Sequence, residues 1–170
     1  MGKYQLICLF VWINVSVSAQ DIIKSFLDSH GKDDNLEIVT IGKKMIAMMD
    51  TLTSNNPDLS EAIKGFETIR IVSSKDSDVN KEYYSSARTL LSKSEKMKEL
   101  FSMNNENNEL VIMIRESKDS VNELILLSEQ SAEFNLISIS GKINLDVLLK
   151  YYKGLNIKEI NKLRSVKNNK

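Results

Sequence analysis

The stretch that decides the fold spans residues 110–140 and reads LVIMIRESKDSVNELILLSEQSAEFNLISIS. It contains three apolar-rich runs, at residues 110–115, 121–127 and 134–140, which short polar segments separate. Runs of this length between polar turn residues are typical of β-strands. Strands joined by such short connections pair only in the antiparallel sense. The stretch therefore predicts a three-stranded antiparallel meander.

Upstream of the meander, helical patterns dominate. Apolar residues recur three and four positions apart, as on one face of a helix, in residues 21–29, 43–52, 57–65 and 79–91. Two short β-branched runs, residues 36–41 and 68–72, predict further strands. Residues 97–103 fit either a helix or a strand, and residues 104–108 predict a turn. We expect Gly141 to end the sheet.

The end of the chain predicts one more helix. Asn144 is a suitable cap, and four apolar residues would face inward from the helix: Leu145, Leu148, Leu149 and Tyr152. Residues 158–170 are rich in Lys and Asn and predict a flexible basic tail. The element order indicates an α+β fold. It would be a single layer of antiparallel sheet, with the C-terminal three-strand meander and the earlier strands packed on helices, and with a closing C-terminal helix.

The first nineteen residues predict a secretory signal peptide. Lys3 precedes an apolar run at residues 6–17, and Val17 and Ala19 fit positions −3 and −1 of a cleavage site after Ala19. The run is about a dozen residues, whereas a membrane-spanning helix needs about twenty. We therefore expect a single domain over residues 20–157 with no membrane span after cleavage. The chain would be exported to the periplasm or the extracellular space, without disulfides because Cys8 is removed.

Composition argues against several function classes. The chain has 23 basic and 23 acidic residues, and this balance disfavours nucleic acid as a partner. It has one His and one Cys, which leaves few candidates for metal ligands or activated nucleophiles. We expect His30 to be solvated in a polar turn. We predict no catalytic residues, cofactor or metal site and a chain that is not an enzyme, with a carboxylate-based hydrolase as the residual alternative.

Two residue patterns have both a structural and a functional interpretation. Met45, Met48 and Met49 could offer thioethers to Cu(I), but their spacing is also that of the buried face of a helix. Adjacent tyrosines, Tyr83–Tyr84 and Tyr151–Tyr152, could stack on carbohydrate, but packing in the core accounts for them. We expect the structural role in both cases.

A third pattern matches the start of a calcium loop. In the segment Asp76–Asn80, Asp76, Asp78 and Asn80 match its first three ligand positions, yet Lys81 stands where Gly is needed and Ala87 where Glu is needed. The start of this segment, Asp76–Asp78, also precedes a predicted helix, where Asp and Ser cap free backbone N–H groups. We therefore expect a helix cap.

Three segments carry a family resemblance: residues 41–45 (IGKKM), 122–127 (NELILL) and 136–145 (LISISGKINL). Together they resemble the domain of unknown function 4252 family, found in secreted or envelope-anchored proteins of Gram-negative bacteria. The resemblance covers most of residues 21–155 and implies an exported, single-domain architecture. The family has no established activity, ligand or catalytic residue. Some relatives look lipidated, and this chain differs from them because it has no Cys after Cys8.

These observations favour a non-enzymatic binding or interaction module of the bacterial cell envelope, with another envelope protein as partner. A sheet covered by helices on one face leaves its other face or an edge free, and a free edge can accept a partner strand. Five polar residues of the meander could form the outer face: Asn122, Ser128, Asn135, Ser138 and Ser140. The alternative is a small-ligand or Cu(I) carrier that uses the Met-rich helix.

Overall fold

A computed structural model describes residues 22–52, 57–106, 108–117, 120–130 and 133–145. The helices in these ranges are α1 (Ile22–His30), α2 (Lys43–Leu52), α3 (Pro57–Lys64) and α4 (Ser77–Ser92). The strands are β1 (Glu37–Gly42), β2 (Phe66–Ser74), β3 (Lys98–Asn105), β4 (Asn108–Ser117), β5 (Ser120–Gln130) and β6 (Glu133–Ile143). The predicted α+β class is confirmed. The predicted signal peptide, closing helix and basic tail lie outside the described residues.

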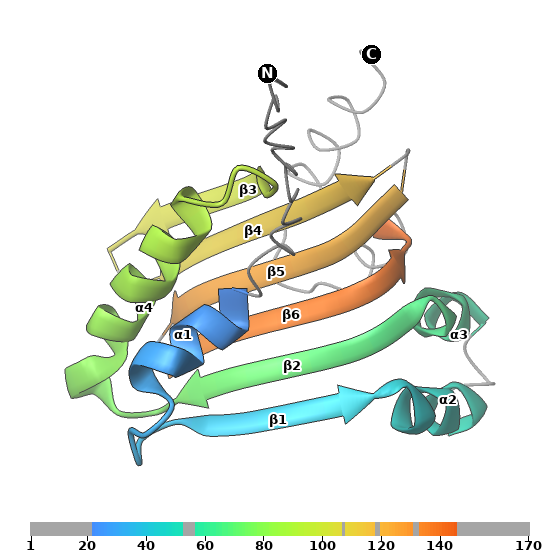
Figure 1. Ribbon diagram of the computed structural model, residues 1–170, viewed down its shortest axis with the longest axis horizontal. Helices are drawn as coiled ribbons and strands as arrows, with labels where there is room; N and C mark the ends of the chain where they lie inside the picture. Colours follow the sequence, from blue (N-terminus) through green and yellow to red (C-terminus); the bar gives the residue numbers. More distant parts are fainter. Residues whose placement is uncertain (1–21, 53–56, 107, 118–119, 131–132, 146–170) are drawn as a thin grey trace, which may run out of the picture.

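The six described strands form one antiparallel sheet in the order β1-β2-β6-β5-β4-β3. The predicted meander is confirmed as β4, β5 and β6. Residues 97–103, which fitted two structures, lie mostly in β3, so that β3 extends the meander by one strand. Strand β2 pairs with β6, and β1 pairs with β2. The sheet is open, and β1 and β3 are its two edges (Figure 1).

Helices α1 and α4 pack on one face of the sheet, which we call the helix side (Figure 1). Phe26 of α1 is fully buried and stacks on Phe134 of β6, with ring centroids 5.5 Å apart. Other buried side chains of this core come from α4 and four strands: Val72, Tyr83, Leu91, Val111, Ile125, Leu127 and Leu136. Burial of each large apolar side chain contributes roughly 1.5–3 kcal/mol to the hydrophobic driving force.

A second apolar cluster lies on the opposite side of the sheet. Successive side chains of a strand point to opposite faces, so Leu110, Ile112 and Ile114 of β4 face away from α1 and α4. Ile46 of α2 and Ile63 of α3 belong to the same cluster. Apolar residues therefore occupy both faces of β4, which explains why its sequence runs LVIMI without alternating polar residues.

The prediction of a polar outer face on the meander is wrong. Ser128 and Ser138 are buried, and they lie on opposite faces of the sheet. Ser138 is paired with Ile125 and shares the helix side, whereas Ser128 is paired with Leu110 on the other side. Asn135 is half-buried beside Ser128. The alternation of the strands thus distributes these polar residues between two largely apolar faces.

Gly141 does not end the sheet, as predicted, but lies inside β6, which continues to Ile143. Its φ of 130° is a conformation that favours glycine. A Cβ atom at Gly141 would lie 2.2 Å from the carbonyl oxygen of Gly65, and the N–H of Lys142 donates to that same oxygen over 2.7 Å. The pairing register shifts here, between Phe66 and Thr68. Gly141 therefore permits an irregularity where β6 meets the start of β2.

We expect Gly141→Ala to lower the free energy of unfolding by about 2 kcal/mol or more, because it adds both a backbone strain and a clash. Gly42→Ala is the matched control. A Cβ atom at Gly42 meets nothing within 4 Å, so this change should raise the free energy by about 0.5 kcal/mol. Urea denaturation of both variants measures the difference. Equal stability of the two would contradict the role given to Gly141.

Candidate functional site

Strand β1, at one outer edge of the sheet, is the most exposed of the described strands. Five of its six residues are exposed, and Ile38 and Val39 each keep 47% of their surface accessible. Strand β1 pairs with β2 on one side, and no strand in the described part of the chain pairs with its other side. An edge strand presents a row of N–H and C=O groups that can pair with another chain. We call the outer side of Glu37–Gly42 the β1 edge.

The opposite edge, β3, is protected. Its register against β4 shifts between Glu99 and Phe101, and such irregularities interrupt pairing along an edge. Lys98 forms an ion pair with Glu116 at 2.9 Å, and Arg88 of α4 forms one with Glu99 at 2.7 Å. Strand β1 shows no register shift against β2, contains no Pro, and has a single charged residue, at its first position. The two edges therefore differ in how readily they accept a further strand.

The helix that follows β1 is turned differently from the prediction. Ile46 is its buried residue, and Met49 is half-buried, while Met45 and Met48 are 53% and 62% exposed. The prediction that Met45, Met48 and Met49 point inward is therefore wrong for Met45 and Met48. The reason is that α2 packs at the end of the sheet through Ile46, in the cluster opposite the helix side. Apolar side chains are thus exposed both on β1 and on the helix that it enters.

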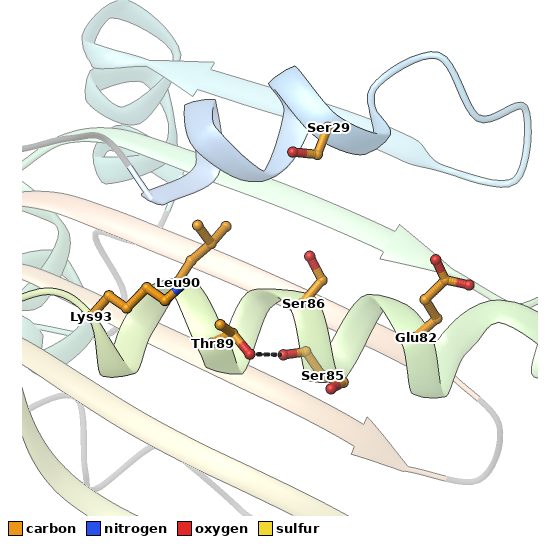
Figure 2. A pocket seen from close by; sticks show the side chains of 7 residues that line it. All are labelled: Ser29, Glu82, Ser85, Ser86, Thr89, Leu90 and Lys93. Carbon is orange, nitrogen blue, oxygen red and sulfur yellow. Dashed lines mark hydrogen bonds between the residues drawn. The ribbon is translucent and has the colours of Figure 1, made fainter.

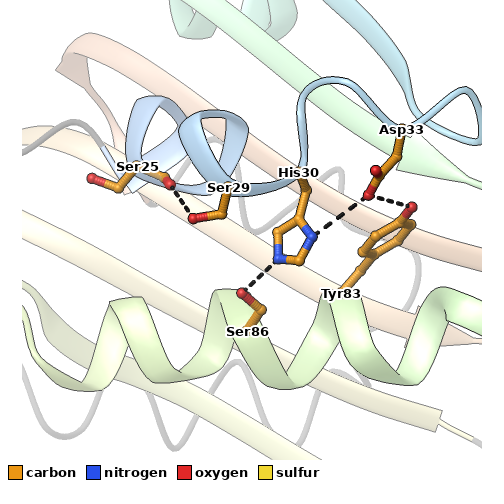
Figure 3. Close-up of polar contacts among 6 residues, drawn as sticks. All are labelled: Ser25, Ser29, His30, Asp33, Tyr83 and Ser86. Carbon is orange, nitrogen blue, oxygen red and sulfur yellow. Dashed lines mark hydrogen bonds and ion pairs between the residues drawn. The ribbon is translucent and has the colours of Figure 1, made fainter.

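His30 is not a solvated turn residue, as predicted, but the last residue of α1, with a side chain only 15% exposed. Figure 3 shows its two ring nitrogens between two polar groups. Nε2 lies 3.0 Å from Oγ of Ser86 on α4, and Nδ1 lies 3.6 Å from a carboxylate oxygen of Asp33. The hydroxyl of Tyr83 donates to the same carboxylate oxygen over 3.1 Å. These contacts join α1 and the turn after it to α4.

The order of atoms in this cluster is that of a Ser-His-Asp triad, which sequence reasoning missed. Beside it lies a cleft of about 480 Å³ between α1 and α4, lined by Ser29, Glu82, Ser85, Ser86, Thr89, Leu90 and Lys93 (Figure 2). A hydrolytic triad also needs donors placed to stabilise an oxyanion, commonly backbone N–H groups. Ser86 lies inside α4, where backbone N–H groups donate to carbonyls of the preceding turn. The geometry therefore fits a structural contact better than a nucleophile.

A second, partly buried polar cluster lies on the helix side of the sheet. Arg115 of β4 and Glu123 of β5 form an ion pair at 2.6 Å, and the Ser138 hydroxyl of β6 donates to Glu123 over 3.0 Å. Arg115 and Glu123 are direct cross-strand partners. This explains how Ser138 can be buried: its hydroxyl is satisfied by a carboxylate. The register of the β4–β5 hairpin is the signal from which this pair could have been found.

Asp76 and the two adjacent tyrosines of α4 have the structural roles expected of them. Asp76 caps α4, since its carboxylate accepts a hydrogen bond from the N–H of Asp78 over 3.1 Å. Tyr83 and Tyr84 are buried in the core, whereas Tyr151–Tyr152 lie outside the described residues. Within the described ranges, no group of three His, Cys, Asp or Glu residues could hold a metal ion. No helix in the same ranges is both long and apolar enough to cross a membrane.

The two buried tyrosines have perturbed acidities. Burial raises the pKa of Tyr83 to about 12, with the hydrogen bond to Asp33 as the next cause. Burial and the nearby carboxylate of Glu109 also raise the pKa of Tyr84. In both cases the protein favours the neutral phenol, because an anion here would lose its hydration and face a carboxylate.

Comparison with known proteins gives one match. A family model described as a domain of unknown function (DUF4252) matches residues 26–151. No curated protein and no solved structure matches the chain. The matched range begins in α1 and extends past β6, and it thus contains the whole sheet and the β1 edge.

The raised pKa of Tyr83 predicts a loss of stability at alkaline pH. A group with a higher pKa in the folded state stabilises fully below its unfolded pKa, near 10, and this stabilisation is lost as pH rises toward 12. Tyr83→Phe should therefore show a shallower decline of the free energy of unfolding above about pH 10 than the wild type. Urea denaturation between about pH 8 and pH 11.5 measures the two slopes. Identical slopes would contradict this assignment.

Proposed function

Given that the chain belongs to the domain of unknown function (DUF4252) family, we propose that it is an exported, non-enzymatic binding module of the bacterial cell envelope. Its partner is an envelope protein that pairs with the β1 edge. The open, apolar β1 edge is the observation that carries this proposal. The signal-peptide pattern that ends at Ala19 supports export.

A partner strand on the β1 edge would gain two kinds of contact. Its backbone would take up the N–H and C=O groups that point away from β2, which supplies affinity with little dependence on sequence. Ile38 and Val39 lie on opposite faces of β1, so the partner's alternate side chains would cover each of them. Since both are about half exposed, their burial would contribute roughly 1 kcal/mol each.

The polar clusters support a binding role over catalysis. Ser86 and His30 are held in a contact between two helices, and Ser86 lies within a helix rather than at a sharp turn. Glu123 is engaged by both Arg115 and Ser138. These groups make contacts between helices and between strands, while the β1 edge is exposed to solvent.

A Cu(I) carrier is the second candidate, favoured by one observation. Met45 and Met48 are both exposed and stand three residues apart on α2, so their thioethers can approach one another. On the primary proposal, a Cu(I) competition titration gives no tight binding, and Met45→Leu/Met48→Leu behaves as the wild type. Tight Cu(I) binding that the double variant abolishes would favour the carrier instead.

The primary proposal is tested by photo-crosslinking in an envelope extract from the host. A photoreactive residue replacing Thr40, in the centre of β1, should yield one saturable adduct, and the same residue replacing Asn104 on β3 should not. Val39→Lys should reduce the Thr40 adduct about tenfold, because a charged side chain on an edge strand opposes pairing. Asn104→Lys is the control with the same added charge, and it should leave the adduct unchanged.

Two results would contradict this function. One is equal crosslinking from both edges, which would indicate non-specific contact. The other is an adduct from Thr40 that Val39→Lys leaves intact. Because Val39 is half exposed, its replacement should not prevent folding, and thermal unfolding of the variant verifies this.

A further inference from the structure

The charges around β1 are distributed unevenly along the chain. Asp34 and Glu37 lie before and at its start, and Lys43 and Lys44 follow its end. All four are exposed, and none of them forms an ion pair with another described residue. Antiparallel pairing places the start of one strand beside the end of the other. Two copies of β1 paired in this way would therefore match acidic with basic ends.

The geometry of a shared sheet limits the possible registers. A two-fold axis perpendicular to the sheet keeps corresponding faces of both copies on the same side. Directly opposed residues must then belong to the same face, which requires the axis to pass through a residue rather than between two. An axis at Thr40 places Val39 opposite Ile41, and it places Glu37 beside Lys43, which directly follows β1 as the first residue of α2. Each of these two contacts occurs twice. Val39 and Ile41 share one face, since both pair with isoleucines of β2 that lie two residues apart.

Neighbouring registers fit less well. An axis at Val39 would place the carboxylate of Glu37 against Ile41. An axis at Ile41 would bring Lys43, at the start of α2, beside Val39. The register centred on Thr40 also places Ile38 opposite Gly42. A Cβ position at Gly42 has no atom within 4 Å, so there is room beside it for the partner's isoleucine. Charge, apolar pairing and space thus select the same register.

We infer that the partner of the β1 edge is a second copy of this chain, paired antiparallel with its own β1 about a two-fold axis at Thr40. The inference rests on the proposed function, because it names the occupant of the same edge. Such pairing uses the β1 edge of both copies at once. It leaves only the two β3 edges, where the register shift and the ion pairs of Lys98 and Glu99 oppose further addition. The assembly therefore stops at a dimer.

The test uses reversed charges and sedimentation velocity of the purified chain. Glu37→Lys should weaken the dimer about tenfold, because the introduced lysine then faces Lys43 of the other copy at two symmetric positions. Lys43→Glu should weaken it to a similar extent, because two carboxylates are then opposed. An equimolar mixture of the two variants should restore association. In a mixed dimer, the lysine introduced at position 37 faces the glutamate introduced at position 43, and Lys43 of the first variant faces Glu37 of the second. Both contacts then pair opposite charges. Glu95→Lys, an exposed change after α4 and away from β1, is the control and should dimerise as the wild type.

Each outcome decides the inference. Restoration by mixing supports it and also shows that both variants are folded. A wild type that stays monomeric up to about 0.2 mM overturns it, as does a dimer that neither variant weakens. A monomeric wild type whose Thr40 position still crosslinks a different protein overturns self-pairing and leaves the proposed function standing. A monomer with no specific adduct overturns both.

Discussion

The pairing of β2 with β6 is the contact on which the rest of the architecture depends. It joins two segments that are distant in sequence, so its formation closes a long loop of chain at a cost in entropy. Burial of apolar side chains at this pairing, chiefly of Val72 and Leu136, offsets that cost. The close approach of Gly65 and Gly141 adapts one end of this pairing. Because β2 lies against β6, the segment after it returns as α4 across the helix side of the sheet, where α1 packs on it. Strand β1 is consequently left outermost.

The two edges of the resulting sheet have different surroundings, and this asymmetry carries the functional argument. Strand β3 is the end of a continuous meander and is held by ion pairs to α4 and β4. Strand β1 is joined to the sheet through β2 alone and leads directly into α2. Its apolar side chains and its complementary flanking charges remain in solvent. The layer that the contacts around His30 and Glu123 hold together thus leaves one strand, β1, open.

Local patterns predicted most elements, but not the contacts made between distant segments. The apolar runs of residues 110–140 gave a correct meander because each strand is bounded by polar residues. The face of α2 was misjudged because KKMIAMMDTL permits more than one inward stripe, and only packing at the end of the sheet selects Ile46. The sequence alone predicts that Gly141 ends the sheet, because its close contact with Gly65 joins residues that are remote in sequence. His30 and Ser86 likewise meet only through the packing of α1 on α4.

On the proposal made above, the β1 edge is free in one chain and covered in an assembly. Hydrogen–deuterium exchange of Glu37–Gly42, measured at several protein concentrations, tests it most directly. We expect the amides that point away from β2 to exchange rapidly at low protein concentration and to become protected as the concentration rises, while the amides of β5 and β6 stay protected throughout. Protection of all β1 amides at the lowest concentration, unchanged at higher concentrations, would rule out a free edge, because the edge would then be covered within the single chain.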